Sequence, residues 1–589
     1  MNGSIQGHLP DNLIDLARAE DFTDDQFLEC FTETERERDL IERLKGPGAH
    51  LLEGPRGVGK SSLLKKAELE MDEEFSLNHV IGVYVNFKAS LLVESGRSEL
   101  GYDPFLCWVA AKILDAFYKK CRKLQFISSH DIDERYKRLL GVSTAWRAAT
   151  LEDSIRDLQS LTVAGSEDAR LDILNKLSLT GLQQFANIEA VAEFVKSIIQ
   201  HAGLNRINFL FDEAAHTFDE QQQEAFFQFF KLLHGGTIAV KAATYPGITS
   251  YGGNFEIGQD AVKLSISSTD ENLESSQAEL RRHFRELLKK RVSSSQFGEL
   301  ARRGEALDLL ILLSHGNPRM FLQTISKWVT TKEYTKRSAL AASNEFVSSE
   351  LVSYHMGLKK RLPRFSAHID LGMALVTAHL VPELQKKNEG KGPDPKIQTV
   401  YFTVDPTVHF KVMKALSLLE YSGYIFAKSV VKTAGRKQAR RFAMHLGVAA
   451  NEKVFHSTFS RDPDIAIKRL SIADYREFYA SDSRFDELVA DHPSTSTCPN
   501  NHPQQTDGAF CPICGARIKV DKVIETLLDD PVERLSLTDF LKSKLQQDFS
   551  ANDIRSVLKL TPTELQTAWM IGPVRARQIV NAAEEYISG

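Results

Sequence analysis

The sequence is poor in the features that mark membrane proteins, secreted proteins and nucleic-acid coat proteins. No apolar stretch of its 589 residues approaches the length of a membrane span, and residues 1–30 lack the basic and then apolar pattern of a signal peptide. Its six cysteines are too few and too unevenly spaced for a disulfide framework. The net charge is −5, so any surface that binds nucleic acid must be local. These absences predict a multidomain globular protein of the reducing cytoplasm, without a membrane partner.

One segment near the start matches the phosphate-binding loop pattern G-x-x-x-x-G-K-[ST] at every fixed position. The apolar run 50–52 predicts a strand before it and residues 61–66 predict a helix after it, which is the context that the motif requires. Backbone N–H groups of such a loop surround phosphate oxygens, and the helix N-terminus adds a favourable dipole. Lys60 is expected to reach the β- and γ-phosphates of ATP, and Ser61 to bind Mg²⁺. The predicted nucleotide-binding residues are Gly54, Pro55, Arg56, Gly57, Val58, Gly59, Lys60, Ser61 and Ser62.

Two further strand ends carry polar groups that such a loop needs. The apolar run 207–211 ends in Asp212 and Glu213, which predicts a buried strand whose carboxylates face the nucleotide. Asp212 is expected to hold Mg²⁺ and Glu213 to polarise the attacking water. The alternative is a strand that ends at a solvated acidic turn. The next strand, 237–244, ends at Thr244, which either contacts the γ-phosphate or is there only as a good β-former.

The order of these elements, followed by the tetrapeptide 316–319 (Gly-Asn-Pro-Arg), resembles the ORC/Cdc6-like branch of AAA+ ATPases and the related STAND signalling ATPases. Residues 31–40 resemble a family segment that lies near the adenine. The resemblance covers about residues 30–345 and implies an α/β core with a parallel sheet, a helical lid, ATPase activity and Arg319 as a sensor. AAA+ enzymes usually add an arginine from a neighbouring subunit, and the sequence does not select among Arg281, Arg282, Arg285 and Arg291.

Residues 349–456 have the pattern of a winged helix, in which helices (366–386 and 407–422) precede two strands joined by a basic tip. ORC/Cdc6 proteins carry a winged helix at this position, which favours DNA as the ligand. A solvated basic hairpin and an internal latch are the alternatives. The residues predicted to contact DNA phosphates are Lys432, Arg436, Lys437, Arg440 and Arg441.

Two small motifs follow. The spacing C-x₃-H-x₈-C-x₂-C supplies three thiolates and one imidazole, a closed tetrahedral set for structural Zn²⁺, from Cys498, His502, Cys511 and Cys514. Residues 570–579 resemble the helix-hairpin-helix motif, with Met570 in place of its first glycine. That resemblance implies contacts with a DNA phosphate from Gly572, Arg575 and Arg577, and packing alone is the alternative.

The predicted function is an ATP-hydrolysing machine that binds DNA in a prokaryotic defence, mobile-element or replication-related system. A homo-oligomer fits this function and, because no nuclease motif is visible, so does a separate effector or nuclease subunit. The alternative is a STAND-type switch that senses a trigger and recruits an effector. The expected domains are an N-terminal helical segment (1–48), the core (49–265) with a helical insert (89–200), the lid (266–348), the winged helix (349–456), a linker (457–497), a zinc ribbon (498–518) and a helix-hairpin-helix-like domain (519–589).

Overall fold

The computed structural model shows two compact bodies that alternate along the chain. The core body comprises residues 36–53, 60–264 and 524–589, and the lid body comprises residues 1–35, 54–59 and 265–523. Within these ranges the structure describes residues 22–88, 93, 103–140, 149–163, 167–178, 187–213, 220–266, 273–331, 333–362, 365–392, 395–405, 407–432, 438–479, 483–492, 514, 527–535 and 537–588.

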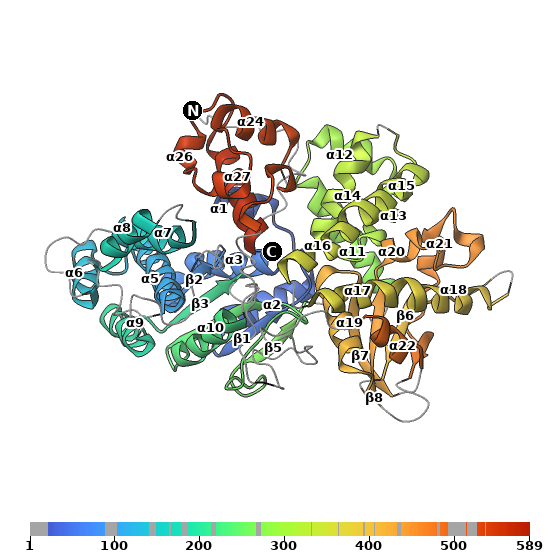
Figure 1. Cartoon of the computed structure of the whole chain (residues 1–589), viewed down its shortest axis with the longest axis horizontal. Helices are drawn as coiled ribbons and strands as arrows, with labels where there is room; N and C mark the ends of the chain where they lie inside the picture. Colours follow the sequence, from blue (N-terminus) through green and yellow to red (C-terminus); the bar gives the residue numbers. More distant parts are fainter. Residues whose placement is uncertain are drawn as a thin grey trace. The chain divides into compact units, whose positions relative to one another are not determined.

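A five-stranded sheet organises the core body, in the order β2-β3-β4-β1-β5, and its neighbours β2·β3, β3·β4 and β4·β1 are parallel. Strand β3 is buried almost throughout, as its continuous apolar run predicts. The strands and nearby helices, shown in blue to green in Figure 1, are α2 (Glu35–Lys45), β1 (Ala49–Glu53), α3 (Lys60–Glu73), α4 (Phe75–Asn78), β2 (Val80–Asn86), β3 (Arg206–Asp212), α10 (Glu220–Leu233), β4 (Ile238–Thr244) and β5 (Val262–Ser265).

The predicted insert is helical, and Figure 1 shows its helices gathered at the β2 side of the sheet. Its first helix begins sharply because the Asp103 side chain accepts from the Phe105 N–H and Pro104 occupies the first turn. Trp108 of that helix packs in one cluster with Phe87, which directly follows β2, and with Phe211 near the end of β3. The insert helices are α5 (Pro104–Leu124), α6 (Ser129–Leu140), α7 (Ala149–Val163), α8 (Glu167–Ser178) and α9 (Ile188–Ala202).

The lid body begins with α1 (Asp24–Cys30) and continues after residue 265 as a run of helices. Two stretches widen to π-helix, and the second precedes Pro382, which has no N–H to continue the regular ladder. The helices up to the second sheet are α11 (Leu273–Lys289), α12 (Ser294–Ala301), α13 (Gly304–Leu313), α14 (Pro318–Thr330), α15 (Lys336–Phe346), η6 (Val347–Leu351), α16 (Val352–Arg361), α17 (Ser366–Leu375), η8 (Val376–Leu380) and α18 (Val381–Glu389).

A second sheet, ordered β7-β8-β6-β9, lies in the lid body. The predicted hairpin is present as the antiparallel pair β7·β8. The predicted linker 457–497 needs a correction, because β9 within it pairs in parallel with β6 and Phe478 of β9 is buried. A strand of four residues is too short to show a clear pattern in sequence. The elements are β6 (Tyr401–Val404), α19 (Phe410–Ser422), β7 (Ile425–Lys432), β8 (Gln438–Met444), α20 (Leu446–Asn451), η9 (Ser457–Phe459), α21 (Pro463–Lys468), β9 (Tyr475–Phe478) and α22 (Ser483–Asp491).

The last described part of the chain is a small helical unit. It consists of η10 (Val532–Arg534), α24 (Asp539–Phe549), α25 (Ile554–Leu558), α26 (Pro562–Leu565) and α27 (Pro573–Ser588). Across the described residues of both bodies, every helix is too short or too polar to cross a lipid bilayer.

Candidate functional site

Two acidic residues lie at the carboxyl end of β3, where parallel neighbours also end. Asp212 is paired in register with Asn86, the last residue of β2, and is fully buried. Its Oδ2 accepts a hydrogen bond from the Tyr84 hydroxyl at 2.6 Å, and its Oδ1 accepts from the Glu213 N–H at 3.1 Å. Glu213 has φ of +60°, an uncommon conformation for a residue with a side chain. The chain therefore turns sharply where the second carboxylate is presented.

Lys60 opens α3 at the same edge of the core body, and its side chain is buried with 4% exposure. The Lys60 Nζ atom lies 3.7 Å from the centre of the Tyr245 ring, which follows β4 directly. The Tyr245 hydroxyl donates to Glu213 Oε1 at 3.4 Å. One aromatic side chain thus contacts both the predicted phosphate-binding lysine and the predicted water-activating carboxylate.

The phosphate loop itself, residues 54–59, is covalently continuous with β1 and α3 and makes its contacts within the lid body. Gly57 and Gly59 have φ of +81° and +100°, which favours glycine at both positions. A side chain on Gly57 would meet Asn317 Oδ1 at 2.8 Å and Arg319 Cβ at 2.9 Å. The loop therefore packs tightly against the tetrapeptide 316–319, which is called the lid motif below.

The lid motif both starts α14 and holds the loop. Asn317 caps the helix by accepting from the Met320 N–H, while its Nδ2 donates to the Arg56 carbonyl at 2.9 Å. The Arg319 N–H donates to the Gly57 carbonyl at 3.4 Å. The tetrapeptide is thus a helix start, as its sequence suggests, and also a support for the phosphate loop.

Arg56 extends these contacts to two tyrosines of α16 and α19. Its Nη1 donates to the Tyr354 hydroxyl at 2.9 Å, and its guanidinium carbon lies 5.1 Å from the centre of the Tyr354 ring. The Arg56 N–H donates to the Tyr421 carbonyl at 3.4 Å, and the Tyr354 hydroxyl donates to that of Tyr421 at 3.0 Å. The phosphate loop is therefore bound to the region that also carries the β7–β8 hairpin.

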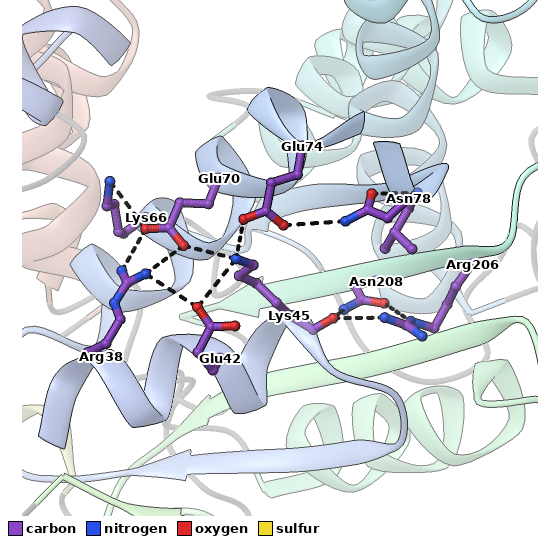
Figure 2. A network of polar contacts seen from close by, with 10 residues as sticks. Arg38, Glu42, Lys45, Lys66, Glu70, Glu74, Asn78, Arg206 and Asn208 are labelled. Atoms are coloured by element: carbon purple, nitrogen blue, oxygen red, sulfur yellow. Dashed lines mark hydrogen bonds and ion pairs between the residues drawn. The ribbon is translucent and has the colours of Figure 1, made fainter. Parts of the chain in front are cut away.

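An ion-pair network joins α2 to α3 in the core body (Figure 2). Glu70 accepts from Arg38 at 2.6 Å and 2.9 Å and from Lys45 at 3.2 Å, and its other neighbour is Lys66 at 3.3 Å. Burial alone would raise the pKa of Glu70, but the hydrogen bonds from Arg38 and Lys45 outweigh it and lower this pKa to about 2. The network fixes α2, which includes most of the segment expected near the adenine, against the helix that begins at Lys60.

A second buried lysine lies toward the amino end of the same sheet. Lys241 of β4 is fully buried and donates to the Pro47 carbonyl, to the Gly48 carbonyl at 2.6 Å and to His50 Nδ1 at 2.9 Å. Burial, followed by repulsion from Arg206, lowers the pKa of Lys241 to about 7. Burial and the Lys241 charge lower the pKa of His50 to about 4, so this ring stays neutral and accepts. These contacts anchor the connection from α2 to β1.

The remaining predicted site residues are scattered. Thr244 is fully buried at the end of β4, next to Tyr245. Arg441 is 9% exposed, with its guanidinium carbon 5.1 Å from the Tyr475 ring centre, while Arg440 pairs with Glu420 at 3.1 Å and Lys432 is exposed. Residues 436 and 437 lie outside the described residues. Tyr475, which lies against Arg441, belongs to β9, a strand that the sequence did not predict.

The hairpin before α27, which carries the predicted phosphate contacts Gly572, Arg575 and Arg577, lies within the described residues. Met570 takes φ of +68°, the conformation for which a glycine would be preferred. Arg575 donates to the Met570 carbonyl at 2.7 Å and its guanidinium carbon lies 5.3 Å from the Phe540 ring centre. Gly572 is exposed and Arg577 is half-buried. Arg575 therefore braces the hairpin.

The predicted metal ligands lie in two separate parts of the chain, Ser61 and Asp212 for Mg²⁺ and residues 498–514 for Zn²⁺. Mg²⁺ prefers oxygen ligands, and the buried Asp212 carboxylate together with the Ser61 hydroxyl and the nucleotide's phosphates supplies that chemistry. Three of the expected zinc ligands, Cys498, His502 and Cys511, lie outside the described residues, and Cys514 is exposed. Among the residues that the structure describes, no three His, Cys, Asp or Glu side chains come together as a metal site.

Comparison with known proteins identifies the family of the N-terminal part. Residues 12–245 match the model of the ORC-CDC6-like family, so the chain carries an ORC-CDC6-like domain there. The predicted resemblance is confirmed over residues 12–245. No curated protein matches the chain significantly.

Among solved structures, the chain is similar to a Walker-type ATPase of Pyrococcus abyssi, with 15% identity, 72% of this chain and 95% of that chain covered, and a TM-score of 0.32. It is also similar to the ORC1 protein of Aeropyrum pernix in complex with DNA, with 13% identity, 73% and 92% coverage, and a TM-score of 0.28. A third structure is the ORC2 protein of Aeropyrum pernix in its ADPNP and ADP complexes, with 11% identity, 72% and 92% coverage, and a TM-score of 0.25.

Proposed function

We propose that this chain, which carries an ORC-CDC6-like domain, binds and hydrolyses MgATP and uses the bound nucleotide to control DNA binding by the lid body and the C-terminal modules. The family match supports the ATPase part. The proposed control of DNA binding rests on the contacts of the phosphate loop and on the basic residues farther along the chain.

The described residues supply the chemistry of ATP hydrolysis in named roles. Lys60 neutralises charge on the β- and γ-phosphates, and Asp212 with Ser61 holds Mg²⁺. Glu213 orients a water whose oxygen attacks the γ-phosphorus, while the bond from that phosphorus to the bridging oxygen breaks. ADP leaves with the electron pair, and the water's proton passes through Glu213 to solvent. The products are ADP and inorganic phosphate.

The observation that carries the proposal is the grip of the lid body on the phosphate loop. Arg56 contacts Tyr354 and Tyr421, while Gly57 packs against Asn317 and Arg319. Bound phosphate fixes the conformation of such a loop, because its N–H groups must point at the phosphate oxygens. A change in the loop therefore changes what the lid helices and α19 contact, and binding at one place is linked to binding at the other.

The proposed DNA surface is the winged-helix-like β7–β8 hairpin with its connecting residues, supported by Lys432 and by the basic residues Arg436 and Lys437 of the sequence. Arg440, which is half-buried, pairs with Glu420, and the buried Arg441 lies against Tyr475, so both position the hairpin. We further propose that the zinc set at residues 498–514 and the hairpin at 570–577 add contacts. Lysine and arginine contacts with phosphates make such binding salt-dependent and mostly independent of DNA sequence.

A STAND-type switch is the second candidate, because the same loop contacts suit a latch that nucleotide opens or closes. Turnover that DNA stimulates favours the first function. Tight retention of nucleotide with negligible affinity for DNA favours the second.

The test is the affinity of the full chain for a fluorescent DNA duplex of about 30 base pairs. The affinity is measured in the Glu213→Gln variant without nucleotide, with ADP and with ATP. We expect the Kd for DNA to differ by about 10-fold between the ATP and ADP states. Tyr354→Leu should reduce this ratio toward one, while Tyr479→Leu, which alters an exposed tyrosine of the lid body, should leave it unchanged. DNA affinity that is the same in all nucleotide states would contradict the proposal.

A further inference from the structure

The side chain of Tyr245 contacts both Lys60 and Glu213. It follows β4 directly and is 5% exposed. The sequence pattern drew attention to Thr244 at the strand tip, because a polar residue there often contacts the nucleotide. The structure instead brings the next residue into contact with both groups.

The ring of Tyr245 holds the Lys60 ammonium. The Nζ atom lies 3.7 Å from the ring centre, and both side chains are almost completely removed from solvent. An ammonium over an aromatic face is attracted by the ring quadrupole, and the attraction is largest where water is excluded. In the chain without nucleotide, this contact compensates Lys60 for part of its lost hydration. When phosphates bind, they become the partner of the ammonium instead.

The hydroxyl of Tyr245 orients the Glu213 carboxylate. It donates to Oε1 at 3.4 Å, while the Glu213 N–H is held by Asp212 Oδ1. Glu213 has its backbone at φ of +60°, which persists only where the surroundings hold it. Glu213 is therefore held at its backbone N–H by Asp212 and at its carboxylate by Tyr245.

The place of the Tyr245 ring is itself fixed by a short turn. The Tyr245 N–H donates to Thr249 Oγ1 at 2.9 Å, and the Thr249 N–H returns a bond to the Tyr245 carbonyl at 3.3 Å. Gly247 allows this turn, because its φ is +74°. These bonds fix the backbone from which the ring projects, and the surrounding protein buries the ring itself.

We propose that Tyr245 is a positioning residue for ATP hydrolysis, whose hydroxyl aims the Glu213 carboxylate at the attacking water and whose ring holds Lys60 until phosphates replace it. This assignment rests on the proposed ATPase function. The two parts of the side chain have different roles. The hydroxyl affects the rate of hydrolysis, and the ring competes with the phosphates for Lys60.

Two variants of the full chain test this separation. Tyr245→Phe keeps the ring and removes the hydroxyl, so we expect a single-turnover hydrolysis rate lowered by about 10-fold or more, with the Kd for a fluorescent ATP analogue unchanged. Tyr245→Leu removes both, so we expect the same loss of rate and, because only the nucleotide-free state loses a contact, binding that is about 5- to 10-fold tighter. A purely structural role would weaken binding and lower the rate together.

The matched control is Tyr118→Phe, which also removes a hydroxyl that donates to a carboxylate, that of Asp133, but within the insert. It should leave rate and affinity unchanged. The proposal is overturned if Tyr245→Phe hydrolyses ATP at the wild-type rate, or if Tyr245→Leu binds the analogue no more tightly than wild type does. A wild-type chain that neither binds nor hydrolyses ATP would instead overturn the ATPase function itself.

Discussion

Two buried lysines contact the same sheet of the core body in opposite ways. Lys60, toward the carboxyl ends of the strands, lies over an aromatic ring. Lys241, toward the amino ends, donates to two backbone carbonyls and a neutral histidine. We propose that phosphate replaces the aromatic partner of Lys60, whereas the partners of Lys241 are groups of the protein that stay in place. Burial of a lysine therefore indicates a ligand site only when its partners are exchangeable.

The largest expected effect separates these two lysines. Lys60→Ala should weaken MgATP binding by about 100-fold or more, because its charge faces the phosphates. Lys241→Met should leave the affinity for MgATP within about twofold, since Lys241 Nζ donates to the connection before β1 and to His50 near the start of β1. Calorimetric titration of the full-length variants measures both. Equal losses of affinity in the two variants would remove the distinction drawn here.

The α2–α3 network allows a second, smaller test of the same sheet. Glu70→Gln should lower the free energy of unfolding by about 2 kcal/mol at pH 7, because three cations lose their shared carboxylate. The pKa of Glu70 is lowered to about 2, so its contribution is present above about pH 4.5 and is lost as the pH falls toward 2. Urea unfolding at several pH values measures the difference between variant and wild type. Glu42→Gln, at a more exposed partner of Arg38 and Lys45, is the control and should cost much less.

A pH dependence at Lys241 tests the other side of the comparison. Because its folded pKa is about 7, the unfolded chain binds one more proton between about pH 7 and 10.4, so wild-type stability should rise with pH across that window. Lys241→Met should lack this rise. Urea unfolding between pH 7 and 10 measures the slope, and parallel curves for the two proteins would show that Lys241 remains charged.

The sequence was sufficient for features carried by continuous segments. The loop at 54–61 and the apolar run at 207–211 lie where their patterns predict, on the parallel sheet of an α/β core. In each case the neighbours along the chain determine the structure. The order of these segments also led to the correct family for residues 12–245.

Features that depend on distant segments could not be predicted in this way. Tyr245 acquires its contacts only because β3 and β4 end beside one another and α3 begins at the same edge. The Tyr354 and Tyr421 contacts with Arg56 join residues about 300 and 365 positions apart along the sequence. The sequence predicts Arg441 as a surface cation because Tyr475 of β9, whose ring lies against its guanidinium, falls in a segment predicted to be a linker. No local pattern marks such pairs.

The most direct test of the whole account is the release of phosphate from ATP by the purified full-length chain, compared between wild type and Glu213→Gln. We predict measurable turnover for wild type and a loss of about 100-fold or more for the variant, which should still bind ATP, because only the group that activates water is changed. Wild-type turnover in the Glu213→Gln variant, or no ATP binding by either protein, would contradict the assignment of this sheet edge as the site of hydrolysis.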